Sequence, residues 1–141
     1  MSARGLIEAF RRIRGIPAIV RAWVVLRRVE RGPRVHVRGR LLVHSEGRIC
    51  IGESSFFREG MVATELSCGP EAELVVGKRC GFNYGVSITA AKSVRIGEHC
   101  IFGSFSRVRD DDGLKVAPVL IGDGVWVAHG AIVEPGFTNA V

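Results

Sequence analysis

Several features that define common protein classes are scarce in this sequence of 141 residues. It has 2 Trp, 1 Tyr and 7 Phe, and its four cysteines form no C-x-x-C pair. The spacing therefore excludes a zinc ribbon and a dithiol redox motif. No run of 18 apolar residues occurs, and arginines interrupt every apolar stretch in residues 1–30. Neither a transmembrane helix nor a signal peptide is expected. These absences favour a chain that works in the cytoplasm.

Positive charge is concentrated at the N-terminus. Residues 1–40 contain eleven arginines and two glutamates, whereas residues 41–141 contain nine Lys or Arg and twelve acidic residues. The formal net charge of +6 therefore comes from a basic arm attached to a slightly acidic body. Only the arm therefore has the excess positive charge that would attract an acidic partner.

Residues 5–30 are predicted to form an amphipathic helix, because Leu6, Phe10 and Ile13 recur at three- and four-residue spacing. Pro17 is expected to kink this helix, and Gly32-Pro33 to end it. We expect a basic helical arm over 1–33 and a second domain over 34–141. The arm has two candidate roles, packing on this domain or a neighbouring subunit, and peripheral contact with an anionic membrane leaflet. Nucleic-acid binding is not expected, because no reader motif accompanies the charge.

A repeat begins after residue 34. Four tetrads have the form apolar–x–Ile/Val–Gly, and a large apolar residue follows six positions after each Ile or Val. The tetrads span 49–52, 74–77, 94–97 and 119–122, and the later apolar residues are Phe57, Phe82, Phe102 and Val127. A period of six is neither helical nor a simple strand alternation, and it is typical of hexapeptide-repeat β-helices. The sequence therefore predicts a parallel β-helix of about four coils.

The spacing of the tetrads also predicts where loops leave the coils. Successive tetrads are 25, 20 and 25 residues apart, more than three hexads require. We expect insertions near 65–73, 90–92 and 109–117, and inserted loops are where function usually lies. Small residues follow each tetrad at a fixed distance, which suits a crowded corner. We therefore interpret two of them, Cys80 and Cys100, as packing residues and not as nucleophiles.

The stretch from Val119 to Gly136, VLIGDGVWVAHGAIVEPG, resembles the Trp-bearing segment of left-handed β-helix acyltransferases, in particular the sugar O-acetyltransferase branch. The resemblance covers about residues 45–136. It implies an all-β fold, a left-handed parallel β-helix of about four coils after an N-terminal amphipathic α-helix. It also implies transfer of an acetyl or other acyl group from coenzyme A to a sugar hydroxyl. Members are homotrimers with sites between subunits. Their chains continue into further C-terminal coils, and the present sequence, which runs to Val141, does not contain these coils.

The resemblance assigns roles to individual residues. Asn83 matches an acceptor-binding asparagine, Trp126 an aromatic residue lining the coenzyme cleft, and His129 the residue whose backbone N–H approaches the thioester oxygen. Asp110 and Asp112 match carboxylates that orient the catalytic base. That base is a histidine in the family, but Leu114 occupies its position here, and leucine cannot accept a proton. Among the histidines, we expect only the ring of His129 near the cleft, because His36 and His44 precede the first predicted coil.

Two functions follow from this pattern. The first is an acyl-CoA-dependent O-acyltransferase acting on a sugar or polysaccharide precursor, cytoplasmic or peripheral on the inner membrane face. The second is a catalytically inactive scaffold or hetero-oligomer partner, favoured by Leu114 and by the missing coils. A carbonic anhydrase is disfavoured, because His99 and His129 do not show its arrangement of zinc ligands, and no metal is expected.

Overall fold

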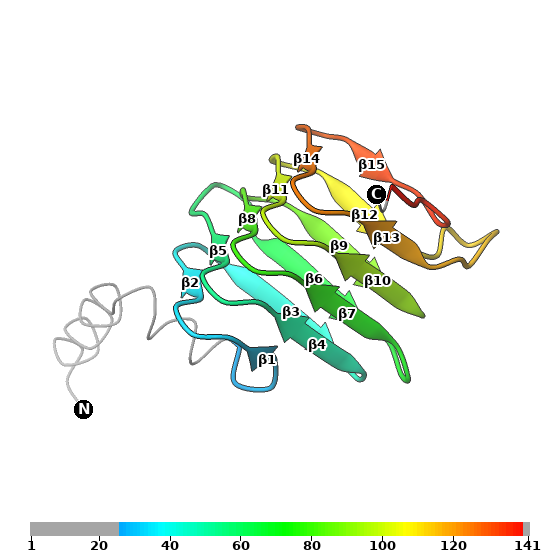
Figure 1. The fold of residues 1–141 in the computed structure, drawn as a ribbon, viewed down its shortest axis with the longest axis horizontal. Coiled ribbons are helices and arrows are strands. Elements are labelled where there is room, and N and C mark those ends of the chain that lie inside the picture. Colours follow the sequence, from blue (N-terminus) through cyan, green and yellow to red (C-terminus); the bar gives the residue numbers. More distant parts are fainter. Residues whose placement is uncertain (1–25, 140–141) are drawn as a thin grey trace, which may run out of the picture.

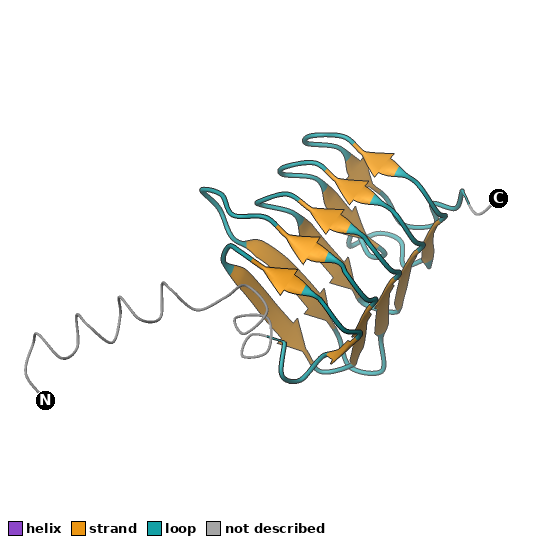
Figure 2. Ribbon diagram, turned by 60° about the vertical axis from the view of Figure 1, so that its left-hand side comes forward, coloured by secondary structure: helices purple, strands orange, loops and turns teal. Residues whose placement is uncertain are grey.

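The computed structural model describes residues 26–139, which wind into a parallel β-helix of five turns, each turn contributing one strand to each of three sheets. Every strand pair in this part of the chain is parallel. Figures 1 and 2 show the strands stacked in rows along the solenoid axis. The predicted all-β parallel β-helix is therefore confirmed.

Each sheet has five strands. Sheet A contains β1 (Glu30–Arg31), β4 (Arg48–Ile51), β7 (Glu73–Val76), β10 (Ser93–Ile96) and β13 (Val119–Ile121). Sheet B contains β2 (His36–Val37), β5 (Phe56–Phe57), β8 (Gly81–Phe82), β11 (Ile101–Phe102) and β14 (Trp126–Val127). Sheet C contains β3 (Leu41–Ser45), β6 (Thr64–Cys68), β9 (Ser87–Ala90), β12 (Arg107–Arg109) and β15 (Ile132–Val133).

The prediction of about four coils was one turn short. The first turn consists of β1, β2 and β3, and Arg31 pairs with Ile51 of the next turn. Arg31 stands where the other turns have Ile or Val, so this turn escapes the hexad pattern. His36 and His44 consequently lie within the solenoid, on β2 and β3, and not before it.

The predicted helix over 5–30 lies mostly outside the described residues. Residues 26–29 form a turn, in which the Val29 N–H donates to the Leu26 carbonyl at 2.9 Å, and β1 begins at Glu30. The end of the predicted helix was therefore placed too late, because pairing with β4 holds this segment extended. Within residues 26–139, no helix is long and apolar enough to cross a bilayer.

The core is built from columns of inward residues that repeat from turn to turn. Phe57, Phe82 and Phe102 stack face to face, with ring centroids 4.7 and 4.9 Å apart. This spacing matches the distance between neighbouring strands of a sheet, so the hexad period itself brings the rings into contact. The tetrad glycines serve the same close stacking, since a Cβ on Gly52 would lie 2.5 Å from the backbone of Gly77.

The small residues at one corner connect successive turns. Ser55 Oγ donates to the Gly77 carbonyl, and the Cys80 and Cys100 thiols donate to the next tetrad glycine carbonyls, each at 3.1 Å. Burial raises the pKa of the Cys80 thiol to about 11, and burial likewise raises the pKa of Cys100. A thiol must ionise to act as a nucleophile, so this geometry supports the interpretation of both cysteines as packing residues.

The insertions lie close to their predicted places, with one difference. Nine residues, 110–118, join β12 to β13, in agreement with the third predicted insertion. The first insertion is divided between two corners. Six residues join β5 to β6, where three join β2 to β3, and four join β6 to β7, where two join β3 to β4. The tetrad spacing measures only the total length of a turn, so it could not reveal this division.

Candidate functional site

One outward column of sheet B carries a large side chain in every turn except at Gly81. His36 pairs with Phe56, Phe56 with Gly81, Gly81 with Ile101, and Ile101 with Trp126. Gly81 contributes no side chain, and the Phe56 ring and the Ile101 side chain close over it, since a Cβ there would lie 3.0 Å from Ile101 Cδ1. The neighbouring side chains therefore fill the space that a side chain at Gly81 would take.

A cavity of about 320 Å³, called here the central cavity, lies on this face of sheet B. It contains Asn83, Trp126 and His129, three of the residues assigned from the sequence. They come from two different turns, and the structure brings them to one surface. The lining residues are Phe56, Arg58, Gly81, Phe82, Asn83, Ile101, Phe102, Gly103, Ser104, Trp126 and His129.

Asn83 is held at the corner that follows β8. Its backbone N–H donates to the Phe102 carbonyl at 2.9 Å, and its own carbonyl accepts the Thr64 hydroxyl at 3.0 Å. The side-chain Oδ1 accepts the Tyr84 N–H at 3.0 Å. The side-chain NH2 has no partner within residues 26–139, so it remains a donor for a ligand in the central cavity.

His129 occupies the equivalent corner after β14. Its ring packs edge-on against Phe105, with centroids 5.7 Å apart, and Phe105 packs in the same way against Tyr84. A Cβ on Gly103 would lie 2.6 Å from His129 N, so the absence of a side chain at Gly103 permits the close approach of the two turns. In the part of the chain that the structure describes, the His129 N–H has no hydrogen-bond acceptor. This amide is therefore an unused donor on a residue that lines the central cavity.

Trp126 lies on the rim of the central cavity, with 75% of its surface exposed. Its neighbour in the adjacent strand, Ile101, is 44% exposed. An exposed indole beside an exposed aliphatic side chain forms an apolar surface of the kind that marks ligand or partner contacts. The orientation of Trp126 therefore agrees with a role in binding rather than in the core.

The inserted loop of residues 110–118 lies at another corner, between sheets C and A. Asp110 is fully buried, and its carboxylate accepts the N–H groups of Ala91, Lys92 and Ser93, each at 2.7 Å. Within residues 26–139, all side-chain hydrogen bonds of Asp110 therefore go to the corner of the preceding turn. Asp110 does not line the central cavity.

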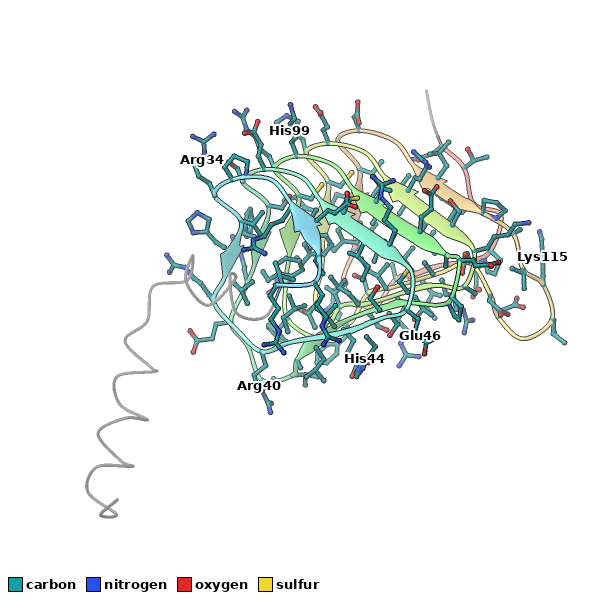
Figure 3. All side chains as sticks on the ribbon, turned by 90° about the horizontal axis from the view of Figure 1, so that it is seen from below. Arg34, Arg40, His44, Glu46, His99 and Lys115 are labelled. Atoms are coloured by element: carbon teal, nitrogen blue, oxygen red, sulfur yellow. The ribbon has the colours of Figure 1, made fainter. Side chains whose placement is uncertain are left out.

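The loop projects from the prism beyond Asp110. Asp112 accepts the N–H groups of Leu114 and Lys115, both at 2.8 Å, and these bonds lower the pKa of its carboxyl group. Leu114, at the position of the expected base, is 98% exposed. Figure 3 shows Lys115 on this loop, well separated from the corner that carries His99. Asp110, Asp112 and Leu114 thus form a group apart from Asn83, Trp126 and His129 within one chain.

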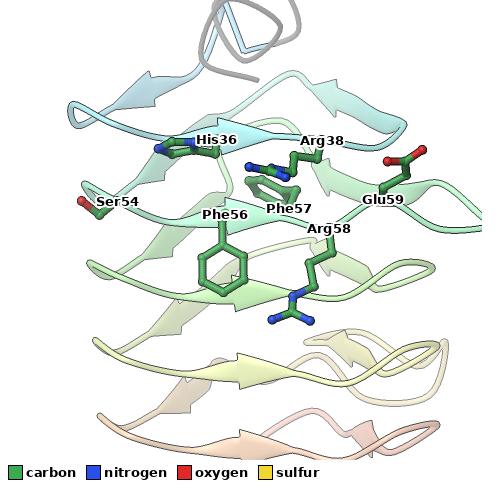
Figure 4. A pocket seen from close by; sticks show the side chains of 7 residues that line it. All are labelled: His36, Arg38, Ser54, Phe56, Phe57, Arg58 and Glu59. Atoms are coloured by element: carbon green, nitrogen blue, oxygen red, sulfur yellow. The ribbon is translucent and has the colours of Figure 1, made fainter. Parts of the chain in front are cut away.

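Sequence reasoning missed a second hollow on sheet B, called here the arginine cavity. It has a volume of about 600 Å³ and shares Phe56 and Arg58 with the central cavity. Its lining includes His36 and Arg38 from the first turn (Figure 4). These residues were overlooked because the first turn lacks the Ile/Val–Gly signal. Their place on sheet B follows only from the strand register, in which His36 pairs with Phe56 and Val37 with Phe57.

A third hollow, of about 450 Å³, lies on sheet C and the corner that follows it. His44, Glu46, Ser67 and Thr89 are among its lining residues. No side-chain hydrogen bond joins His44 to Ser67 or Thr89 within residues 26–139, so the histidine does not activate either hydroxyl in this arrangement. The same described part of the chain contains no group of three or more His, Cys, Asp or Glu residues arranged to hold a metal ion.

Comparisons with family models, with curated proteins and with solved structures found no match. The fold and the geometry of the cavities are therefore the basis for assigning a function.

Proposed function

We propose that this protein transfers an acyl group from a coenzyme A thioester to a hydroxyl group of a sugar or polysaccharide precursor. The observation that carries the proposal is the meeting of Asn83, Trp126 and His129 in the central cavity. Each of these positions has a role in the acyltransferase family that the sequence resembles. Trp126 and His129 lie more than forty residues from Asn83 along the chain.

The geometry supports a role for each residue. The free NH2 of Asn83 donates to an oxygen of the acceptor, and the exposed face of Trp126 packs on the pantetheine part of the acyl donor. The acceptor oxygen attacks the thioester carbonyl, the C–S bond then breaks, and the thiolate of coenzyme A leaves. The free N–H of His129 stabilises the oxyanion of the tetrahedral intermediate, a contribution worth about 10²–10³-fold.

The proton of the acceptor hydroxyl needs a base, which then returns it to the departing thiolate. His129 is the histidine that lines the central cavity. In the proposed assembly, the His129 ring of a neighbouring copy of the chain reaches the acceptor hydroxyl and acts as this base. General base catalysis of this kind contributes about 10²–10⁴-fold. The assembly proposed is a homotrimer, in which the projecting loop with Leu114 packs against an adjacent subunit. Residues 5–25 of the basic arm lie outside the described residues, and their contact with the inner membrane face is part of the proposal.

The test is a thiol-release assay with acetyl-CoA and a panel of sugar acceptors. Native protein is expected to release coenzyme A only when an acceptor is present. His129→Ala is expected to reduce the rate by about 10²-fold or more, and His44→Ala, the same change on sheet C, is the control that leaves it unchanged. Absence of turnover, together with absence of acetyl-CoA binding by calorimetry, would refute the proposal.

One observation favours a second function, that of an inactive scaffold. Leu114 occupies the position of the expected base, and leucine cannot accept a proton, so a chain without this base favours a scaffold. Leu114→His distinguishes the two functions. Activity that appears only in this variant identifies a scaffold descended from an enzyme, whereas activity in the native chain supports the enzyme.

A further inference from the structure

The arginine cavity has a composition that the proposed chemistry does not use. Arg38 and Arg58 hold equivalent positions in consecutive turns, because Val37 pairs with Phe57. Their backbones are therefore separated by one strand spacing, about 4.8 Å. Two guanidinium groups line the cavity and one carboxylate, that of Glu59, lines it with them. Among residues 26–139, the lining of this cavity therefore carries more positive than negative side chains.

Arg58 is positioned for an anion by its surroundings. Its guanidinium lies over the ring of Phe56, 5.7 Å from the ring centroid, a cation–π contact that favours this placement of the side chain. No carboxylate lies within ion-pair distance of Arg58 in the described part of the chain, although five other ion pairs do form there. A planar guanidinium held in this way offers paired N–H donors to phosphate oxygens.

We propose that the arginine cavity binds the phosphate group of a phosphorylated sugar acceptor. Figure 4 shows His36 and Arg38 on one turn and Phe56 and Arg58 on the next, around a common space. His36 adds a ring N–H, and Phe56 adds an apolar face beside the cations. A few polar donors around an aromatic wall are typical of small-molecule sites.

The assignment to the acceptor rests on the proposed function. The arginine cavity adjoins the central cavity, because Phe56 and Arg58 line both. Trp126, which faces the acyl donor in the proposed function, lies three strands away from Phe56 in sheet B, about 14 Å at the usual strand spacing. The donor therefore occupies the β14 end of the face and the acceptor the β2 end. Asn83 lies between them and contacts the reacting hydroxyl.

The binding site is tested by calorimetric titration of the full chain with inorganic pyrophosphate. Arg58→Gln is expected to weaken binding by about ten- to a hundred-fold, the usual effect of losing hydrogen bonds to a charged group. Arg107→Gln removes the same charge from an exposed position on sheet C and is expected to change the affinity less than two-fold. Equal weakening in both variants, or no saturable binding to the native chain, would overturn the proposal.

A second titration identifies which substrate carries the phosphate. Glucose 1-phosphate is compared with methyl glucoside, and acetyl-CoA with acetyl-pantetheine, which has no phosphate. The proposal expects Arg58→Gln to weaken glucose 1-phosphate binding and to leave acetyl-CoA binding unchanged. Weakening of acetyl-CoA alone would assign the cavity to the coenzyme and overturn the acceptor assignment.

The same measurements separate this inference from the proposed function. Pyrophosphate binding that depends on Arg58 needs no turnover, so it remains measurable in a protein that transfers no acyl group. Turnover without Arg58-dependent binding of pyrophosphate would instead support the proposed acyl transfer and contradict the proposed phosphate site.

Discussion

Replacing Asp110 with Asn separates a structural from a catalytic role for this carboxylate. The two oxygens of Asp110 accept three backbone N–H groups at 2.7 Å within a fully buried site. An Asn side chain has one acceptor oxygen and one NH2 group. If its oxygen accepts from Lys92 and Ser93, its NH2 faces the N–H of Ala91, and a donor meets a donor.

The expected loss in the free energy of unfolding follows from those three hydrogen bonds. One charge-assisted hydrogen bond, worth about 1.5–3 kcal/mol, is lost, and the other two become neutral and weaker. We expect Asp110→Asn to lower the free energy of unfolding by about 3–5 kcal/mol, a large share of the stability of a typical domain. Asp111→Asn is the matched control, since Asp111 accepts one side-chain bond, from the Gly113 N–H, and a loss below about 1 kcal/mol is expected.

Urea unfolding followed by circular dichroism measures both variants. With a slope of about 1–3 kcal/mol per M, a loss of 3 kcal/mol moves the midpoint by about 1–3 M. Equal midpoints for Asp110→Asn and Asp111→Asn would refute the structural reading of Asp110. Unchanged stability combined with lost acyl transfer would show instead that the carboxylate serves the reaction.

Three further outcomes test the fold. Phe82→Ala, in the middle of the stacked rings, is expected to cost about 3–5 kcal/mol of unfolding free energy, measured by the same urea titration; a cost below 1 kcal/mol would contradict a tightly packed column. In the native chain, Cys50 is expected to react with a thiol reagent faster than buried Cys80, whose pKa is about 11; equal rates by mass spectrometry would show an open corner. The carboxyl pKa of Asp112 lies below its ordinary value, so the stabilisation from this carboxylate is present above the unfolded pKa, about 4, and is lost as pH falls through the lower folded pKa. An NMR midpoint at or above 4 would contradict the two backbone hydrogen bonds.

Much of the candidate site was accessible from sequence, and two parts of it were not. Asn83, Trp126 and His129 were assigned from the motifs around them, and the structure places them on one cavity. Asp110 and Asp112 were assigned with them, yet within one chain they lie at a different corner. A motif fixes the local conformation, but the side of the prism to which a loop turns depends on the summed lengths of the segments before it.

The first turn illustrates the same limit. His36 and Arg38 line the arginine cavity, but no hexad signal marks their turn because Arg31 replaces the apolar residue. Their place follows from pairing with β5, which is a contact between residues twenty positions apart. Pairing of this kind has no signature in a short window of sequence.

The period of six is enough to predict the parallel coil and its inward columns, because it fixes which side chains point inward and which residues stack on them. The folded chain was needed to find the number of turns, the division of the first insertion, the burial of Asp110 against Ala91–Ser93 and the sharing of Phe56 and Arg58 by the two cavities on sheet B. These features depend on how turns of unequal length align along the axis, and that alignment is set by contacts between residues distant in the chain.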